Sequence, residues 1–297
     1  MLKSLYDVAA PAKVNLFLHI IGRRADGYHL LQSVFALIDW TDVLHFELRT
    51  DAVLQRHDLG PVLPAHDLCL RAAQALQARS GTRLGADISI DKRVPWGAGL
   101  GGGSSDAASV LLALNRLWGL NWPLSRLLQL GVELGADVPF FLHGRNAFVE
   151  GIGEVLTPVP LPRQWLAVIK PPAAVDTRAV FASALVVRDT QPVILESFTA
   201  EAAQADAKGF PDGFGRNDLQ GAALALCSDV AQAAGILEAS FGNSRMTGSG
   251  SAAFARAGSN AQPTAAMPAP LAPGWVGRMC RSLEHHPLFG WAPGEEV

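Results

Sequence analysis

The N-terminal part of the chain alternates regularly between apolar and polar positions. From residue 12 to residue 21 every second side chain is apolar, and Lys13 and Asn15 occupy the positions in between. Side chains alternate between the two faces of a β-strand, so the pattern predicts a strand on which Lys13 and Asn15 are neighbours. Two interpretations of this polar pair stay open: a solvated strand face, or two functional side chains.

Further along, strand and helix patterns are mixed. Strands are predicted over residues 30–39, 43–48, 86–90, 146–152, 165–170 and 252–256, with a strand or the start of a helix over 275–280. Helices are predicted over residues 68–79, 106–120, 124–134, 176–185, 196–208, 219–227 and 229–241. Asp67 is a candidate N-cap for the first of these helices, and Gly81 is placed to end it. Residues 50–65, which are polar and turn-rich, and residues 259–274, which are rich in Pro and Ala, are predicted as loops.

A proline-rich segment near the middle of the chain suggests a domain boundary. It extends from Thr157 to Pro162, between two predicted strands. A chain of 297 residues is long enough for two domains with cores of their own. We therefore predict domains over residues 1–158 and 159–297.

The segment with the most glycine is Pro95 to Ala107, which reads PWGAGLGGGSSDA and contains five glycines in thirteen residues. Glycine permits a positive φ and a close approach of the backbone, and an ordinary turn needs it only once or twice. An apolar stripe at i, i+4, i+7 and i+11 from Ala107 predicts a helix directly after the loop, and Ser104, Ser105 and Asp106 are N-cap types. Because a helix N-terminus has unpaired N–H groups and the positive end of the dipole, the segment is predicted to bind an anion, typically phosphate.

Two better-known glycine motifs fit this segment less well. A common P-loop would end in Lys-Ser or Lys-Thr, where this chain has Gly103-Ser104. The pattern G-x-G-x-x-G is present from Gly97 to Gly102, but residues 118–129 lack the acidic residue that a dinucleotide site places about twenty positions on. A nicotinamide-dependent oxidoreductase, or a flexible loop beside an apolar helix, are the alternatives to a phosphate-binding loop.

Two ring side chains follow a predicted turn. The turn signal is Asp26-Gly27, and Tyr28 and His29 come directly after it. Such a pair can stack on a flat ring and hydrogen-bond with its edge. The alternative is that both residues simply lie at the edge of a sheet.

Charged candidates lie on either side of the glycine segment. Lys92 and Arg93 precede it, either as counter-charges for phosphate or as a surface pair. Asp137 stands in GADVPFF, close to Phe140 and Phe141. A carboxylate among phenylalanines is costly unless it is paired or used, although a turn or cap role is also open.

Composition narrows the class of protein. The formal net charge is −3, which gives no general reason to expect a nucleic-acid or membrane partner, and no obligatory protein partner is evident. The three cysteines, Cys69, Cys227 and Cys280, form no C-x-x-C, so neither a disulfide framework nor a zinc site is indicated. No secretory signal pattern or membrane-spanning apolar run is present, and we expect a cytoplasmic protein.

Four segments together resemble a known family. PWGAGLGGGSSDAA resembles the P-x-x-x-G-L-G-S/G-S-S loop of the GHMP kinases, which phosphorylate small metabolites. PAKVNLFLHI, GADVPFF and MTGSGSAAFA stand in the places of the family's other motifs, in the expected order and in both halves of the chain. The continuation IGRRADGYHLLQSVF, together with GRNDL, resembles the branch that acts on a small molecule carrying a cytidine diphosphate group, in the non-mevalonate isoprenoid pathway.

The resemblance implies a fold and a reaction. The implied fold is α+β, with an N-terminal domain like the second domain of ribosomal protein S5 that carries ATP. A ferredoxin-like C-terminal domain would complete the substrate cleft. The implied reaction is ATP-dependent phosphorylation of a hydroxyl on the sugar-alcohol part of the substrate.

The resemblance also assigns roles to particular residues. Lys13 and Asp137 match the family's catalytic lysine and aspartate, and Asp137 would accept the proton of the substrate hydroxyl. Lys13 would stabilise the ionised carboxylate and the developing charge on the hydroxyl oxygen. Tyr28 and Phe181 would sandwich the cytosine ring, while His29 would bind its edge.

Further matched residues are assigned to the rest of the substrate and to ATP. Asn15 and Thr177 would contact the sugar-alcohol or diphosphate part. The implied ATP-binding residues are Lys92, Pro95, Trp96, Gly97, Ala98, Gly99, Leu100, Gly101, Gly102, Gly103, Ser104 and Ser105. Mg²⁺ is expected with ATP; no dedicated protein ligand is implied for it, although the hydroxyl of Ser104 or Ser105 could contribute.

Two positions depart from the pattern of this branch, and two other functions stay open. Asp67-Leu68 stands where Asn-Leu is common in the adenine pocket, and Ser251 stands where a small residue such as Ala or Cys is usual. An aspartate can accept a hydrogen bond from an amino group but, when ionised, cannot donate one. The open functions are another GHMP kinase with a different acceptor and a non-catalytic nucleotide sensor. The presence of Lys13 and Asp137 argues against the sensor.

Overall fold

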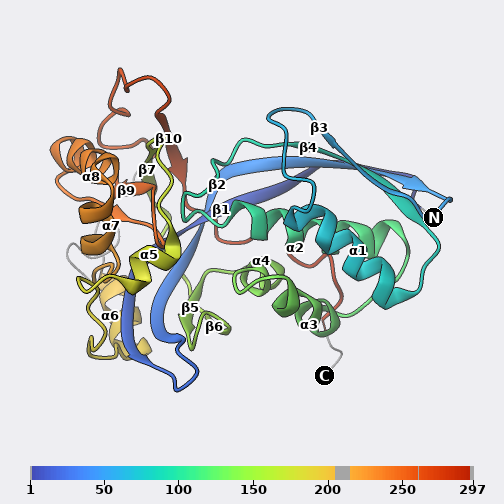
Figure 1. Ribbon diagram of the computed structural model, residues 1–297, viewed down its shortest axis with the longest axis horizontal. Coiled ribbons are helices and arrows are strands. Elements are labelled where there is room, and N and C mark those ends of the chain that lie inside the picture. Colours follow the sequence, from blue (N-terminus) through green and yellow to red (C-terminus); the bar gives the residue numbers. More distant parts are fainter. Residues whose placement is uncertain (1, 205–214, 260, 295–297) are drawn as a thin grey trace.

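The computed structural model describes residues 2–204, 215–259 and 261–294, and it shows two β-sheets with helices packed on them (Figure 1). The first sheet has six strands: β1 (Ser4–Arg23), β2 (His29–Arg49), β3 (Leu54–Asp58), β4 (Gly85–Asp91), β5 (Ala147–Glu150) and β6 (Val155–Pro158). Its order is β3-β4-β2-β5-β6, with β1 paired antiparallel to β2. The second sheet has four strands in the order β10-β7-β9-β8: β7 (Trp165–Lys170), β8 (Arg245–Met246), β9 (Ala253–Arg256) and β10 (Val276–Arg281).

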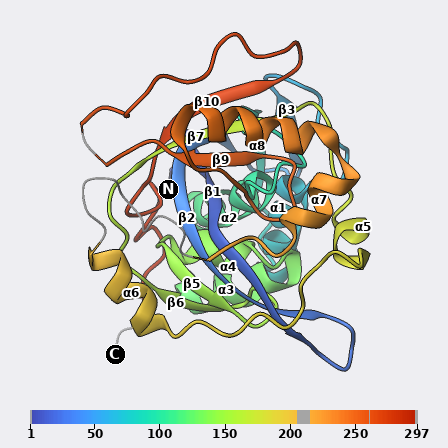
Figure 2. The ribbon, with the colours of Figure 1, turned by 90° about the vertical axis from the view of Figure 1, so that its left-hand side faces the viewer.

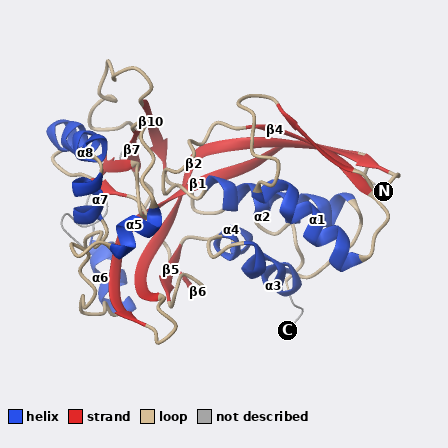
Figure 3. Cartoon of the chain, viewed as in Figure 1, coloured by secondary structure: helices blue, strands red, loops and turns tan. Residues whose placement is uncertain are grey.

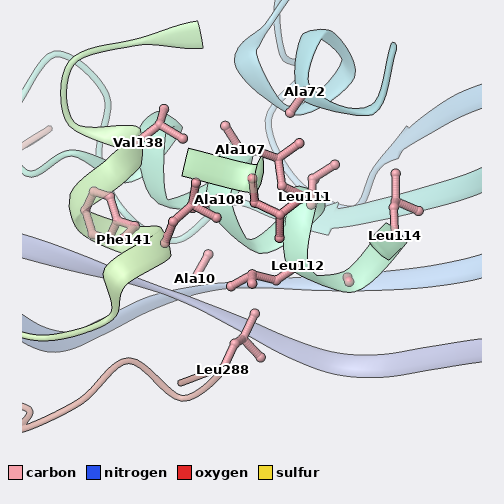
Figure 4. Close-up of a cluster of buried hydrophobic side chains, with 14 of the residues drawn as sticks. Ala10, Ala72, Ala107, Ala108, Leu111, Leu112, Leu114, Val138, Phe141 and Leu288 are labelled. Carbon is pink, nitrogen blue, oxygen red and sulfur yellow. The ribbon is translucent and has the colours of Figure 1, made fainter. Parts of the chain in front are cut away.

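The helices of the first half all lie on one side of the first sheet (Figure 3). They are α1 (Leu68–Ser80), α2 (Gly102–Leu117), α3 (Leu124–Leu134) and α4 (Val138–His143). Nearly all side chains of α2 after its first turn are buried. Figure 4 shows Leu111 and Leu112 of α2 in this core with Val138 and Phe141 of α4 and with Leu288 from the C-terminal segment. The core thus holds the N-terminus of α2, and the glycine segment before it, in a fixed place.

The helices of the second half are α5 (Thr177–Ala182), α6 (Leu195–Gln204), α7 (Gln220–Leu226) and α8 (Ser228–Phe241). Figure 2 shows α8 lying across the outer face of the second sheet, where Ala233 and Leu237 share a buried cluster with Ile169. The opposite face packs on the first sheet, with Val168 and Val14 in one buried cluster. Among the described residues no single helix is long and apolar enough to cross a membrane, and α7 and α8 pass that test only as a pair bent by 120°.

The longest elements are β1 and β2, of 20 and 21 residues, which extend from the first half of the molecule into the second (Figure 1). The N–H of Leu18 donates to the carbonyl of Arg216 at 2.9 Å, and Leu18 forms an isolated bridge with Asn217. Around Lys13 and Asn15 both faces of β1 are covered, and these residues are 3% and 2% exposed. Their interpretation as a solvated strand face is therefore wrong.

Many of the predicted elements are confirmed. Asp67 caps α1, because its side chain accepts from the N–H of Leu70 at 3.1 Å, and Gly81 ends the helix with φ +69°. The ambiguous segment 275–280 is strand β10, and the described residues of 259–274 contain neither helix nor strand. The helix predicted over 196–208 is confirmed as far as Gln204, while residues 205–208 lie outside the described part.

Three predictions about elements are wrong. Residues 50–65 are not all loop, because they contain β3, which pairs in parallel with β4. The sequence of β3 is polar and shows no strand pattern. Its charged residues are accommodated in the strand because Arg56 forms ion pairs with Asp58 and Asp67, both at 2.7 Å. The strands predicted over 30–39 and 43–48 are one continuous strand, β2.

The third error concerns the start of α2. Ser104, Ser105 and Asp106 are not caps, because the helix begins at Gly102 and its N-cap is Gly101 with φ +69°. Ser105 and Asp106 are instead buried in the first turns of the helix. Their polar side chains therefore face the interior beneath the glycine segment.

The proposed boundary at residues 158 and 159 lies between β6, of the first sheet, and β7, of the second. The last described segment returns to the first half, where the N–H of His286 donates to the carbonyl of Gly144 at 2.9 Å. Leu288 is buried in the same core as α2. The division into domains 1–158 and 159–297 stays a prediction.

Candidate active site

The glycine segment forms a tight loop between β4 and α2. Gly99 has φ +71°, and a Cβ built there would lie 2.2 Å from the carbonyl oxygen of Thr247. Gly101 has φ +69°, and its Cβ would meet the ring of Phe141 at 2.9 Å. Both positions therefore require glycine, because a side chain would be strained in φ and would also collide with its neighbours. The loop is thus held directly against a second glycine-rich turn, around Thr247.

This loop lines a cavity of about 390 Å³, here called the loop cavity. Of the residues expected to bind ATP, all except Ser105 line it, together with Leu63, Pro64, Asp67, Leu68 and Asp106. The first N–H groups of α2 have no acceptor within the helix, and the helix dipole adds positive potential there. The cavity therefore combines backbone N–H groups that suit an anion with apolar wall residues such as Leu63 and Leu68.

Three charged side chains are buried under the loop cavity. Lys92 Nζ donates to Asp106 Oδ2 at 2.7 Å and also to Asp42. Burial raises the pKa of Asp106 to about 8, although Lys92 opposes the shift. Burial alone would lower the pKa of Lys92, but Asp106 and Asp42 outweigh it and raise that pKa. Lys92 thus reaches the cavity as expected, but its ammonium is already bonded to the side chains of Asp42 and Asp106.

The lysine and aspartate expected to be catalytic lie together. Lys13 Nζ is 3.7 Å from Asp137 Oδ2, and it donates to Asn15 Oδ1 at 2.6 Å. The N–H of Lys13 donates to the carbonyl of Leu100 at 2.9 Å, so β1 is tied to the glycine loop. Burial lowers the pKa of Lys13, and the nearby Asp137 opposes this shift. Asp137 precedes α4 and remains partly exposed.

Thr247 is a further residue of this centre that the sequence did not single out. Its Oγ1 accepts from the N–H of Asn15 at 3.0 Å and lies 3.2 Å from the carbonyl oxygen of Gly99. Thr247 therefore joins β1, the glycine loop and the second glycine turn. The segment MTGSGS indicates a glycine turn, but no local pattern shows which of its side chains bonds to residues in the first half of the chain.

A second large cavity, of about 620 Å³, has ring side chains in its wall and is called the aromatic cavity. Tyr28, His29, Thr177 and Phe181 line it, as the resemblance implies. The ring centroids of His29 and Phe181 are 5.1 Å apart, although these residues lie on β2 and α5. Thr177 Oγ1 lies 2.7 Å from Ser249 Oγ, which ties the start of α5 to the second glycine turn.

A smaller cavity of about 180 Å³, the middle cavity, shares lining residues with the other two. Its wall includes Lys13, Asn15 and Asp137. It shares Gly99 and Gly101 with the loop cavity, and it shares Leu31, Ile152 and Phe181 with the aromatic cavity. A carboxylate and an ammonium therefore lie between the glycine loop and a cavity lined by ring side chains. Such an arrangement can present a hydroxyl group to a bound phosphate.

Sequence reasoning also missed Arg188, which bonds to two residues of the aromatic cavity. Its Nε donates to His29 Nε2 at 3.3 Å, and its Nη2 donates to the carbonyl of Phe181 at 2.8 Å. Arg188 follows α5 in a segment without regular structure, so neither a motif nor a periodicity marks it.

The start of α2 offers side-chain oxygens that suit Mg²⁺. Ser105 Oγ and Asp106 Oδ1 are buried there and have no hydrogen-bond partner within the described part of the chain. Ser104 lines the loop cavity itself. Mg²⁺ prefers oxygen ligands and is commonly held by one or two protein groups together with phosphates. The residues present fit such an ion.

Comparisons with known proteins agree with this geometry. A family model described as "GHMP kinases N terminal domain" matches residues 67–145. The 4-diphosphocytidyl-2-C-methyl-D-erythritol kinase of Methylibium petroleiphilum is 62% identical over 293 residues, which cover 98% of this chain and 99% of that protein. The kinase of the same name from Variovorax paradoxus is 54% identical, with coverage of 98% and 100%.

Solved structures extend the comparison. A 4-(cytidine 5'-diphospho)-2C-methyl-D-erythritol kinase superposes with a TM-score of 0.70 at 38% identity, over 86% of this chain and 90% of that one. A homoserine kinase from Cytophaga hutchinsonii superposes with a TM-score of 0.65 at 16% identity, over 96% of both chains. At that lower identity the likeness shows the fold alone. The fold is therefore the two-domain α+β fold of these kinases, as expected.

Proposed function

We infer the function of this chain from its family: it belongs to the 4-diphosphocytidyl-2-C-methyl-D-erythritol kinases, a branch of the GHMP kinases. The chain is a kinase that uses ATP to phosphorylate 4-diphosphocytidyl-2-C-methyl-D-erythritol, at the C2 hydroxyl, in the non-mevalonate route to isoprenoid precursors. The observation that carries this conclusion is that Lys13 and Asp137 line the middle cavity, which shares residues with both the loop cavity and the aromatic cavity.

The site residues are proposed to act in three groups. The glycine loop and the N-terminus of α2 bind the triphosphate of ATP in the loop cavity. Tyr28 and Phe181 stack on the cytosine ring in the aromatic cavity, and His29 binds its edge. Asn15 and Thr177 contact the part of the substrate between the ring and the reacting hydroxyl.

The chemical step is proposed to centre on Asp137. Its carboxylate accepts the proton of the C2 hydroxyl while the oxygen bonds to the γ-phosphorus and the bond to the leaving ADP oxygen breaks. The Lys13 ammonium, 3.7 Å from Asp137, stabilises the negative charge that develops on the hydroxyl oxygen. Asn15 and Thr247 hold Lys13 and the loop in place through the bonds described above.

Mg²⁺ is proposed as the ion that accompanies ATP, because it neutralises phosphate charge. Ser104 or Ser105 would supply the hydroxyl ligand, and the Oγ of Ser105, which has no hydrogen-bond partner among the described residues, supports this choice. The proposed setting is the cytoplasm, where the free thiols of Cys69, Cys227 and Cys280 stay reduced.

A coupled assay of ADP release with ATP, Mg²⁺ and 4-diphosphocytidyl-2-C-methyl-D-erythritol tests this proposal. We expect wild-type turnover, and a fall in kcat on the order of 10²–10⁴ in Asp137→Asn and in Lys13→Ala. Asp7→Asn is the matched control, because the Asp7 carboxylate is 87% exposed and lines none of the three cavities.

The outcomes separate the parts of the proposal. An active Asp137→Asn variant would keep the kinase but remove the general base. Wild-type protein that binds ATP without turning over this substrate would indicate another acceptor.

A further inference from the structure

A contact with Arg188 determines which nitrogen of the His29 ring carries the proton. Arg188 Nε lies 3.3 Å from His29 Nε2 in hydrogen-bonding geometry. A guanidinium has only donors and stays protonated in proteins, so Nε2 must be the acceptor. An imidazole that accepts at Nε2 has no proton there, and the proton of the neutral ring is then on Nδ1.

The other ring nitrogen is available to a ligand. Within the described residues Nδ1 of His29 has no hydrogen-bond partner, and His29 lines the aromatic cavity while Arg188 does not. The contact with Arg188 therefore occupies Nε2 and leaves Nδ1 for a ligand in the cavity that His29 lines. A neutral ring is supported further because burial lowers the pKa of His29, as do the cationic neighbours Arg188 and Arg23.

We propose that Arg188 is a positioning residue for base recognition, which holds His29 as the tautomer with its proton on Nδ1, so that the cavity offers a donor to the base. This inference rests on the proposed function and deepens it. Cytosine presents an unprotonated ring nitrogen, N3, at its pairing edge, whereas uracil carries a proton at N3. A fixed Nδ1–H donor can hydrogen-bond to N3 of cytosine, but it faces another donor at N3–H of uracil. It therefore selects cytidine over uridine.

The remaining contacts of Arg188 support a positioning role. Nη2 donates to the carbonyls of Phe181 and Ser183, both at 2.8 Å, and Nη1 donates to the carbonyl of Val186 at 3.0 Å. In the described part of the chain these carbonyls and His29 are its partners, and it forms no ion pair there. One side chain thus fixes both the tautomer of His29 and the end of the helix that carries the Phe181 ring.

The test compares the binding of CDP and UDP by calorimetry in wild type and in Arg188→Met. We expect wild type to prefer CDP, and the ratio of the two dissociation constants to fall by about tenfold or more in the variant, because His29 can then change tautomer. The kcat with saturating cytidine substrate is expected to change much less than KM. Arg71→Met, on the exposed side of α1, is the matched control for the loss of an arginine.

A spectroscopic measurement makes the test independent of affinity. Long-range ¹H–¹⁵N NMR distinguishes protonated from unprotonated ring nitrogens, and His29→Gln identifies the signal among the eight histidines. We expect an unprotonated Nε2 in the wild type and a mixture of tautomers in Arg188→Met. Arg188→Lys, which retains a cationic donor, is expected to restore part of the CDP preference, and it replaces the Met variant if that protein does not fold.

Either of two results would overturn the proposal: a proton on Nε2 in the wild type, or an unchanged CDP preference in folded Arg188 variants. Failure of the proposed function looks different. In that case wild-type protein would bind ATP but neither bind CDP nor turn over the cytidine substrate, while the tautomer could still be measured.

Discussion

The loop cavity and the aromatic cavity are built in opposite ways. The loop cavity is lined mainly by one continuous backbone segment, residues 95–104, whose glycines are held against neighbouring atoms. The aromatic cavity is lined by side chains from residues 23–31, 152 and 177–182, which come from both halves of the chain. The first therefore depends on backbone conformation, and the second depends on how side chains are held.

This difference separates the two tasks of the enzyme. Triphosphate is common to many nucleotides, and a backbone cradle binds it without reading the base. The cytidine end distinguishes the substrate, and selection there requires side chains with defined donors and acceptors. We therefore expect substitutions in the loop to lower activity most, and substitutions in the aromatic cavity to change affinity and selectivity.

The largest effect is expected from Gly99→Ala. Its Cβ would lie 2.2 Å from the carbonyl oxygen of Thr247. Relief of this overlap must move the loop or the second glycine turn, and we expect kcat/KM for ATP to fall by roughly 10²-fold or more, since small displacements of reacting groups have effects of this order. Steady-state kinetics with varied ATP measures the loss.

Gly81→Ala is the matched control for this substitution. Gly81 has φ +69°, close to the φ of +71° at Gly99, but a Cβ there would meet nothing within 4 Å. The Gly81→Ala substitution should therefore lower the free energy of unfolding by about 1–2 kcal/mol through backbone strain alone, and it should leave kcat/KM unchanged. Equal effects of the two variants on activity and stability would show that the contact with Thr247 is unimportant.

The same contrast explains how much of the site could be predicted from the sequence. The glycine loop is contiguous, so its density of glycine and the apolar stripe after it were enough to predict an anion site. Arg188 and Thr247 could not be found in this way. They meet His29 and Asn15 across 159 and 232 positions of sequence, and only the packing of the two halves brings them together.

The fold shows a similar limit. The cap at Asp67 and the stop at Gly81 depend on local bonds, and both were predicted correctly. Strand β3 was missed because its charged residues are paired with one another rather than solvated, which hides the alternation that marks a strand. Lys13 and Asn15 are buried because distant segments cover them: the glycine loop and Asp137 lie against Lys13, and Thr247 bonds to Asn15.

A smaller effect is expected from Tyr28→Ala, in the aromatic cavity. Tyr28 is 61% exposed, so its ring contributes little to the core. Stacking of a base on an aromatic ring is worth about 1–3 kcal/mol, and we expect KM for the cytidine substrate to rise by about tenfold with kcat nearly unchanged. Tyr6→Ala is a close control, because Tyr6 is the other tyrosine of the chain and is 59% exposed. A fall in kcat alone would place Tyr28 in the chemical step instead.

The effect expected from Asp106→Asn, under the loop cavity, concerns stability. The pKa of Asp106 is raised to about 8 in the folded protein by burial, whereas an unfolded aspartate has a pKa near ~4. Between these two pH values the folded state holds a proton that the unfolded state lacks, so the free energy of unfolding falls as the pH rises. The slope is at most about 1.4 kcal/mol per pH unit, and the fall ends above the pKa of the folded state. Asparagine cannot ionise and should remove this slope, which urea unfolding of both proteins at pH 6, 7, 8 and 9 would measure. If the free energy of unfolding depended on pH in the same way in wild type and variant, Asp106 would be ionised across this range. Lys92 would then balance the charge of both carboxylates beneath the loop.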